Sequence, residues 1–141
     1  LINLRGEVIG INTAINAQAQ GIGFAIPSST VTQVLDQLIN DGKVIRPWLG
    51  VFTQPVTQEL ANYFGLKAPE GVLISGVAEN SPAQKAGLKR GDIILEYNKK
   101  KVNAPDKLKD EVMNTKIGAE VVVLVYRDGG TIFVPLKIEE R

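Results

Sequence analysis

The sequence predicts an α+β fold, in which about five strands and two or three helices form a small β-barrel or sandwich. Three observations predict it. Apolar runs of strand length alternate with glycine-containing turns, other segments carry apolar residues at helical spacing, and Asp128-Gly129-Gly130 joins two long strand-like runs. With 141 residues, the chain has room for one ordinary domain and an appendage.

The first 27 residues predict a β-hairpin. Two apolar runs, at 7–15 and 22–26, are separated by a polar loop at 18–21, and Pro27 ends the second run. An isolated hairpin is only marginally stable in water. Because its apolar side chains have no obvious core, we expect this segment to be disordered, to pack against the rest of the chain, or to pair across chains at a free edge.

A helix is predicted over residues 28–41, capped at its start by Ser28 or Ser29 and ended by Asp41-Gly42. Five apolar residues share one face at spacings of three and four: Val31, Val34, Leu35, Leu38 and Ile39. A short linker follows at 43–47. We therefore divide the chain into residues 1–43 and 44–141.

The second part contains the remaining elements of the predicted fold. The strands are expected at 48–53, 71–77, 93–97, 120–127 and 131–138, and the helices at 57–64, 81–87 and 105–114. Ser81-Pro82 suits the first turn of a helix, and Gly65 suits the end of another. At Asn98-Lys99 a tight turn would force a positive φ on Lys99, so we expect a longer turn over 99–102.

Composition excludes several classes of function. The net charge of +1, from 16 basic and 15 acidic residues, argues against nucleic acid as a partner, since phosphate binding needs a concentrated positive field. The sequence contains no histidine and no cysteine, so it can build neither a Ser-His-Asp triad nor a thiolate metal site. No apolar run approaches the ~20 residues of a membrane span.

The tetrapeptide Trp48-Leu49-Gly50-Val51 is the candidate binding site. An apolar-Gly-apolar loop that leads into a strand can point successive backbone N–H groups into one concavity. Such a group of donors can hold a carboxylate, and the strand behind it can pair with an extended peptide. An ordinary bend entering a core strand is the alternative for the tetrapeptide alone.

Residues 81–94, Ser-Pro-Ala-Gln-Lys-Ala-Gly-Leu-Lys-Arg-Gly-Asp-Ile-Ile, resemble the S-P-A-x-x-A-G-L-x-x-G-D-x-I signature of PDZ domains of the permuted, bacterial and organellar protease type. The loop at 48–51 is similar to the carboxylate-binding loop of that family. The resemblance implies that the N–H groups of Leu49, Gly50 and Val51 bind a terminal carboxylate, beside Trp48. We expect Gly50 to be required because a side chain there would crowd the peptide.

The first part resembles the last barrel strands of the HtrA/Deg family of serine proteases, at residues 6–13 and 21–28. In that family the nucleophile lies in a Gly-Asn-Ser-Gly-Gly-Pro motif, which this sequence lacks. Its Ser28, Ser29, Ser75 and Ser81 are predicted to be cap, strand or turn residues. The resemblance therefore implies a truncated protease: a remnant of a trypsin-like barrel, a connecting helix and a PDZ domain, with no catalytic residue, no metal and no cofactor.

The predicted groove lies between the strand after the loop and the helix at 105–114. Phe52 and Thr53 are expected on one wall, and Lys109, Val112 and Met113 on the other, with Leu108 and Val112 facing the core. Core filling is an equal alternative for Met113. Arg46 is a possible electrostatic attractant for the carboxylate, although an exposed arginine is more often solvated.

Three functions follow from these observations. The first is binding of C-terminal ends of misfolded, unfolded or signalling proteins by strand addition, to tether substrates or regulate proteolysis in the bacterial cell envelope, periplasmic or anchored through a preceding membrane segment. The second is docking onto neighbouring protease subunits, with an incidental groove. The third, hydrolysis by this chain itself, conflicts with the missing histidine. An intramembrane metalloprotease parent is disfavoured by residues 1–27.

Overall fold

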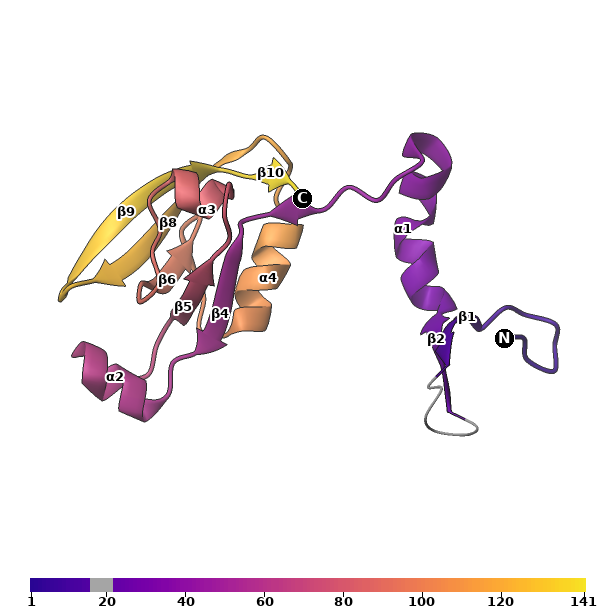
Figure 1. Ribbon diagram of the computed structural model, residues 1–141, viewed down its shortest axis with the longest axis horizontal. Helices are drawn as coiled ribbons and strands as arrows, with labels where there is room; N and C mark the ends of the chain where they lie inside the picture. The colour runs from indigo at the N-terminus through magenta and orange to yellow at the C-terminus, as the bar shows by residue number, and fades with distance from the viewer. Residues whose placement is uncertain (16–21) are drawn as a thin grey trace. The chain divides into compact units, whose positions relative to one another are not determined.

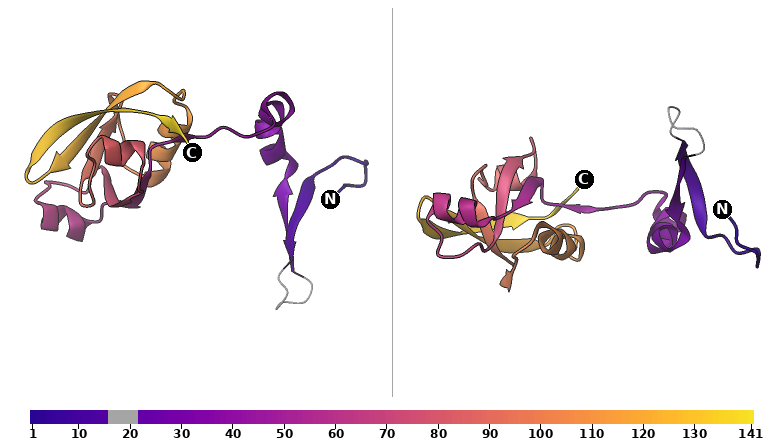
Figure 2. Two further views of the ribbon diagram at one scale, coloured as in Figure 1. Left: turned by 45° about the horizontal axis from the view of Figure 1, so that its top comes forward. Right: turned by 90° about the horizontal axis from the view of Figure 1, so that it is seen from below.

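The computed structural model describes residues 1–15 and 22–141, and these form two compact units, Leu1–Ile45 and Arg46–Arg141 (Figures 1 and 2). The polar loop predicted at 18–21 falls outside the described residues. Among the residues described, no helix is long and apolar enough to cross a membrane.

The first unit consists of a hairpin and a helix, as predicted. Strand β1 (Gly10–Ile15) pairs antiparallel with β2 (Gly23–Pro27), and α1 (Ser28–Asp41) follows directly. The predicted serine cap is wrong. Pro27 holds the N-cap position without a side-chain hydrogen bond, because the strand runs straight into the helix and Ser28 is already helical. Gly42 ends the helix in the left-handed conformation, with φ 70°.

The described part of the first unit has no apolar core of its own. No residue of α1 is buried. Large apolar side chains of the hairpin, its flanks and the helix are exposed: Leu1, Ile2, Leu4, Val8, Ile9, Ile11, Ile22, Phe24, Ile26, Leu35, Leu38 and Ile39. The hairpin therefore keeps its backbone pairing while its side chains lack the cover that normally stabilises such strands.

The second unit has an open antiparallel sheet and three helices, which confirms the α+β class. Its elements are β3 (Pro47–Trp48), β4 (Val51–Pro55), α2 (Gln58–Phe64), β5 (Val72–Val77), α3 (Pro82–Lys85), β6 (Ile93–Tyr97), β7 (Lys100–Lys101), α4 (Pro105–Met113), β8 (Glu120–Arg127), β9 (Gly130–Lys137) and β10 (Glu139–Glu140). The sheet order is β4-β5-β6-β8-β9, with β7 paired to β6, and β10 pairs separately with β3, so neither sheet closes into a barrel.

One predicted strand is interrupted. The segment 48–53 is divided at Leu49-Gly50 into β3 and β4, because Gly50 has φ +85°, which no strand residue adopts. The short strands β7 and β10 were not predicted. The five longer strands and the three helices lie where the sequence indicates, and the Asp128-Gly129 turn joins β8 to β9 with both residues at positive φ.

The turn after β6 differs from the prediction. Asn98 and Lys99 have φ values of 47° and 67°, and Tyr97 pairs directly with Lys100, so the connection is a tight two-residue turn. Lys99 thus adopts the left-handed conformation within the turn. Next to it, Lys100 forms an exposed ion pair with Glu111 of α4 (Nζ to Oε2, 2.7 Å).

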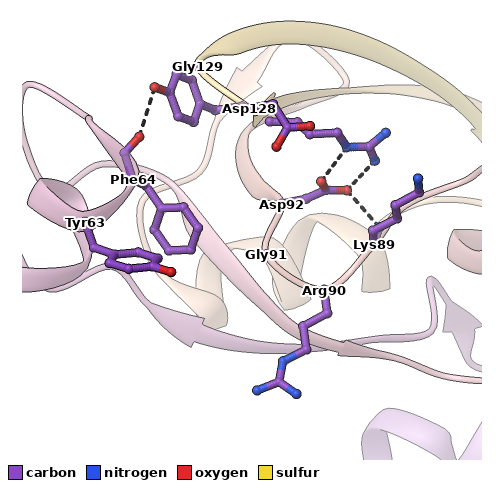
Figure 3. A pocket seen from close by; sticks show the side chains of 10 residues that line it. Tyr63, Phe64, Lys89, Arg90, Gly91, Asp92, Asp128 and Gly129 are labelled. Atoms are coloured by element: carbon purple, nitrogen blue, oxygen red, sulfur yellow. Dashed lines mark hydrogen bonds and ion pairs between the residues drawn. The ribbon is translucent and has the colours of Figure 1, made fainter.

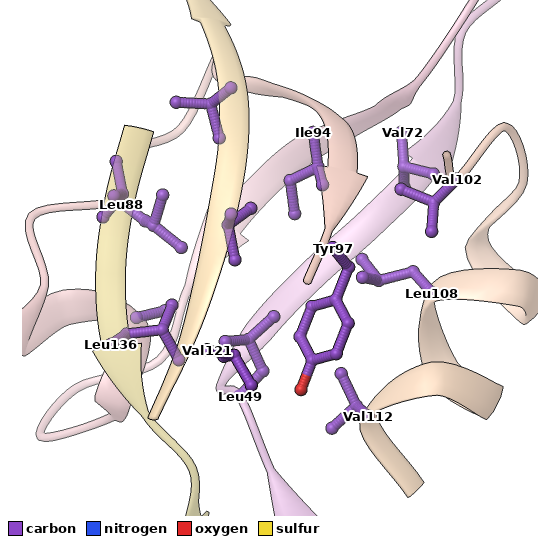
Figure 4. Packing of buried hydrophobic residues seen from close by; sticks show 14 of the residues in the cluster. Leu49, Val72, Leu88, Ile94, Tyr97, Val102, Leu108, Val112, Val121 and Leu136 are labelled. Atoms are coloured by element: carbon purple, nitrogen blue, oxygen red, sulfur yellow. The ribbon is translucent and has the colours of Figure 1, made fainter. Parts of the chain in front are cut away.

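The core lies between the sheet, α3 and α4, and includes the loop before β4 (Figure 4). Leu108 and Val112 of α4 are buried in it, as predicted, together with Leu49 and Tyr97. The Thr115 hydroxyl donates to the Glu111 carbonyl oxygen (2.8 Å), so the Tyr97 hydroxyl donates to Thr115 Oγ1 (2.9 Å). Burial raises the pKa of Tyr97 above its ordinary value of 10.0.

Candidate functional site

The loop between β3 and β4 is tied to the core through its carbonyl groups. The Leu49 side chain is buried, and its carbonyl oxygen accepts a hydrogen bond from the Ala83 N–H (2.9 Å). The Gly50 carbonyl oxygen accepts one from the Ala78 N–H (2.9 Å). Among the described residues, the N–H groups of Leu49 and Gly50 donate no hydrogen bond. The loop thus has its acceptors occupied and two donors free.

The structure shows a constraint on Gly50 in addition to the predicted crowding of a peptide, which stays a prediction. A Cβ atom at this position would lie 2.1 Å from Ser81 Cβ and 2.7 Å from Ser81 Oγ, which is a severe clash with a buried residue. Its φ of +85° also belongs to the left-handed region that favours glycine. The constraint therefore comes from packing behind the loop, and no approaching peptide is needed to explain it.

Among the strands that the structure describes, β4 is an edge of the main sheet and pairs with β5 alone. Hydrogen-bonded and non-hydrogen-bonded pairs alternate along an antiparallel ladder. Because Ala78 donates to Gly50, the next pair, Val51 opposite Val77, is a non-hydrogen-bonded one. The N–H and C=O of Val51 therefore face the free edge, directly after the two free donors of the loop.

Helix α4 lies beside β3 and β4, on the side where the predicted groove was placed (Figure 1). Val51 packs against the core, as do Leu108 and Val112 of this helix. Lys109 and Met113 are exposed on α4, and 45% of Met113 is accessible. Strand β4, which carries Val51, and helix α4, which carries Val112, Lys109 and Met113, are therefore neighbours in the structure.

Phe52 has a different orientation. It follows Val51 in the strand, so its side chain points to the opposite face of the sheet. There it is 62% exposed and lies over Gly76, where a Cβ atom would be 3.3 Å from Phe52 Cδ2. The half-buried Thr53 returns to the Val51 face after a bulge in the pairing with β5. The main chain of Phe52, one residue beyond the non-hydrogen-bonded pair, faces β5 and not the free edge.

Trp48 and Arg46 precede the loop in the chain, and each forms a main-chain interaction while part of its side chain stays accessible. Trp48 is half-buried and pairs with Glu139 of β10. The Arg46 side chain is exposed, while its carbonyl oxygen accepts a hydrogen bond from the Arg141 N–H (3.2 Å). Trp48 is the only tryptophan of the chain, so its fluorescence reports on this loop.

Sequence reasoning missed the residues that support the loop. Ser81 is fully buried, caps α3 by accepting from the Gln84 N–H (3.1 Å), and donates to the Ala78 carbonyl oxygen (2.7 Å). The Ser81-Pro82 pair signals a helix start in the sequence. Its contact with Gly50 lies 31 positions away in the chain and has no sequence signal.

A second polar cluster lies in an open cavity of about 410 Å³ between α2, the turn before β6 and the β8–β9 hairpin (Figure 3). Buried Asp92 accepts hydrogen bonds from Arg127 Nε and Nη2 (both 2.6 Å) and from the Lys89 N–H (2.8 Å). The hydrogen bond with Asp92 raises the pKa of Arg127. Asp92 and Arg127 bond each other, so this cluster connects the turn before β6 to strand β8.

Among the described residues, no group of acidic side chains could hold a metal ion. Every buried side-chain nitrogen and oxygen described has a hydrogen-bond partner. The chemistry available at the loop is therefore hydrogen bonding by main-chain donors next to a free strand edge.

The family model of the PDZ domain matches residues 47–138. Over 144 residues the chain is 47% identical to a probable periplasmic serine endoprotease, DegP-like, of Marinomonas sp. (strain MWYL1), and the match covers 100% of this chain and 31% of that protein. A protein of the same description from Chlamydia trachomatis serovar D is 43% identical over 143 residues, covering 99% and 29%. The chain thus spans about a third of the length of these curated relatives.

Two solved structures are similar over almost the whole chain. The HtrA-type protease AlgWS227A with decapeptide is 36% identical, with a TM-score of 0.80, and the match covers 99% of this chain and 44% of that one. The serine endoprotease from Yersinia pestis is 35% identical, with a TM-score of 0.75, and the match covers 99% and 46%.

Proposed function

This chain belongs to the PDZ domain family and corresponds to a C-terminal PDZ region of the HtrA type, and on that premise we propose that it binds the C-terminal ends of other polypeptides. In this proposal the free N–H groups of the loop at 49–51 bind the terminal carboxylate. The last residues of the ligand then add as a strand to the edge of β4.

One observation carries the proposal: three successive residues offer main-chain groups that the fold leaves free. The N–H groups of Leu49 and Gly50 have no described partner, and the main chain of Val51 faces the open edge of the sheet. Successive free donors suit an anion, and a free strand edge suits an extended peptide. Together they accept a peptide whose carboxylate comes at its end.

Selectivity for the last side chain would come from the apolar surface next to the loop. Val51 and Val112 pack against the core there, and Met113 is a flexible, polarizable neighbour on α4. We expect a C-terminal Val, Leu, Ile, Phe or Ala to be preferred. Because the contact is small and the peptide must become ordered, the dissociation constant is expected to be about micromolar.

The proposed role in a larger protein is based on the relatives of this chain. They are named as periplasmic serine endoproteases, and one solved relative is described with a decapeptide. We propose that this chain acts in the bacterial envelope as the recognition part of such an endopeptidase. There it would tether substrates or regulate proteolysis in protein quality control, next to neighbouring subunits.

Peptide titration tests the proposal. Peptides that end in Val-COOH and their C-terminal amides are titrated against the chain, with Trp48 fluorescence as the signal. The free acids should bind at least about tenfold more tightly, because the amide lacks the charge that the loop donors favour. Equal binding of acid and amide would refute carboxylate capture.

Strand addition is tested separately with N-methylated peptides. A methyl group on every second backbone nitrogen of the ligand removes the donors that face β4, while methylation of the intervening nitrogens leaves them intact. One of the two sets should therefore bind much more weakly than the other. Equal losses in both sets would contradict a paired strand.

A further inference from the structure

The segment Ala78–Ala83, which precedes and begins α3, lies directly behind the carboxylate loop. Resting on the proposed function, we infer that this segment, with Ser81 as its positioning residue, sets the direction of the loop donors and thereby the preference for a carboxylate. Ser81 would not touch the ligand. It would act through Gly50 and through the two hydrogen bonds that hold the loop carbonyls.

The direction of the donors follows from the geometry of the peptide group. In a trans peptide the C=O and the N–H of the next residue point in opposite directions. The Leu49 carbonyl is held by the Ala83 N–H and the Gly50 carbonyl by the Ala78 N–H, both at 2.9 Å. The N–H groups of Gly50 and Val51 must therefore point away from this segment.

Two of the three proposed donors are thus oriented by the same short segment. A carboxylate that approaches from the open side meets both N–H groups already aligned, and the loop loses little freedom on binding. The N–H of Leu49 belongs to the preceding peptide group, whose Trp48 carbonyl lies in β3 opposite Glu139 of β10 and not against this segment. Preorganisation therefore concerns Gly50 and Val51.

Ser81 gives the segment its shape. Its hydroxyl connects the Ala78 carbonyl oxygen (2.7 Å) with the Gln84 N–H (3.1 Å), so it spans the two ends of the segment. The residue is fully buried and packs where a Cβ of Gly50 would lie. Loss of the hydroxyl would leave both partners unsatisfied and free the Ala78 and Ala83 donors to move relative to the loop.

The test compares Ser81→Ala with Thr57→Ala. Thr57 caps α2 in the same way, through its side-chain oxygen and the Leu60 N–H (3.3 Å), but lies outside the loop and its supports. Each variant is titrated with a Val-COOH peptide and its amide. We expect Ser81→Ala to reduce the acid-to-amide affinity ratio about tenfold, mainly through weaker acid binding, and Thr57→Ala to leave the ratio unchanged.

The outcomes separate this inference from the proposed function. If the unmodified chain shows no preference for the acid, carboxylate capture itself fails. If the unmodified chain prefers the acid and Ser81→Ala keeps the same ratio, the proposed function stands and the positioning role is refuted. An equal fall of the ratio in both variants would also refute it, since general loss of stability would then be the cause.

A measurement on the unmodified chain covers the case in which Ser81→Ala does not fold. If binding requires the hydrogen bonds of Ala78 and Ala83, then saturating acid peptide must slow hydrogen exchange of these two amides. At a ligand concentration of about 100 times the dissociation constant, the slowing should be about 100-fold. Unchanged exchange at both amides would overturn the inference.

Discussion

The substitution Gly50→Ala tests whether the loop at 49–51 is held in place by its packing against Ser81. In the structure the new methyl group would lie 2.1 Å from Ser81 Cβ and 3.3 Å from Trp48 Cζ2. The left-handed backbone at φ +85° costs about 1–2 kcal/mol for a residue with a Cβ. Overpacking against buried Ser81 adds about 1–3 kcal/mol. Alanine also restricts the unfolded chain more than glycine does, which offsets about 0.4–1 kcal/mol, so the free energy of unfolding should fall by about 1–5 kcal/mol.

Gly87→Ala is the matched control. Gly87 has a similar φ of +80°, but a Cβ there would have no neighbour within 4 Å. Only the backbone cost applies, and it is partly offset by about 0.4–1 kcal/mol because alanine restricts the unfolded chain more than glycine does. The difference between the two variants isolates the contact with Ser81, which we expect to be about 1–3 kcal/mol.

Urea denaturation followed by Trp48 fluorescence measures both variants in the same unit of the chain. For a domain of about 100 residues, 1 kcal/mol corresponds to a shift of about 4–8 °C in Tm, so thermal unfolding gives an independent value. Equal destabilisation by Gly50→Ala and Gly87→Ala would show that Ser81 does not press against Gly50. In that case, the contact between Ser81 and Gly50 would not be what holds the loop in place.

Three further predictions concern stability. Lys99→Gly should stabilise the chain by about 0.5 kcal/mol in urea denaturation, since the strain of φ 67° exceeds the added entropy of glycine in the unfolded chain; destabilisation would contradict this. Arg127→Met leaves the buried Asp92 carboxylate with the Lys89 N–H alone, and should cost about 3 kcal/mol in the same assay; a loss below about 1 kcal/mol would contradict it. Tyr97→Phe should cost about 1 kcal/mol at pH 7. Because the folded pKa of Tyr97 is raised, its contribution is complete below pH 10.0 and is lost as pH rises further, so the two stability curves should converge in alkali; a constant difference up to about pH 11 would contradict it.

The sequence predicted the elements of the second unit well because their signals are local. Thr57 and Gly65 cap α2 as expected of their types, Ser81 caps α3, and Asp128-Gly129 forms the tight hairpin turn. Each of these residues determines the conformation of its own neighbours. Such signals need no knowledge of distant contacts.

The errors arose where main-chain pairing or a distant contact overrides the preference of a single residue. The turn at Asn98-Lys99 is tight because β6 pairs directly with β7, and Lys99 adopts a φ of 67° within it. The predicted strand at 48–53 is broken at Gly50, whose φ of +85° belongs to a loop packed against Ser81 from another part of the chain. Local propensity contains no information on either contact.

The candidate site itself has little signal in its own residues, and this follows from its chemistry. Main-chain N–H groups occur at every residue except proline, so a site made of them leaves side chains unconstrained except where the backbone must be held in place. In this chain those places are Gly50, which admits Ser81, and the Ala78–Ala83 segment, whose two end residues hold the loop carbonyls. The most recognisable motif of the sequence, which begins at Ser81, is therefore part of the support of the loop at 49–51, and recognition of that support points to a candidate site that its own four residues could not identify.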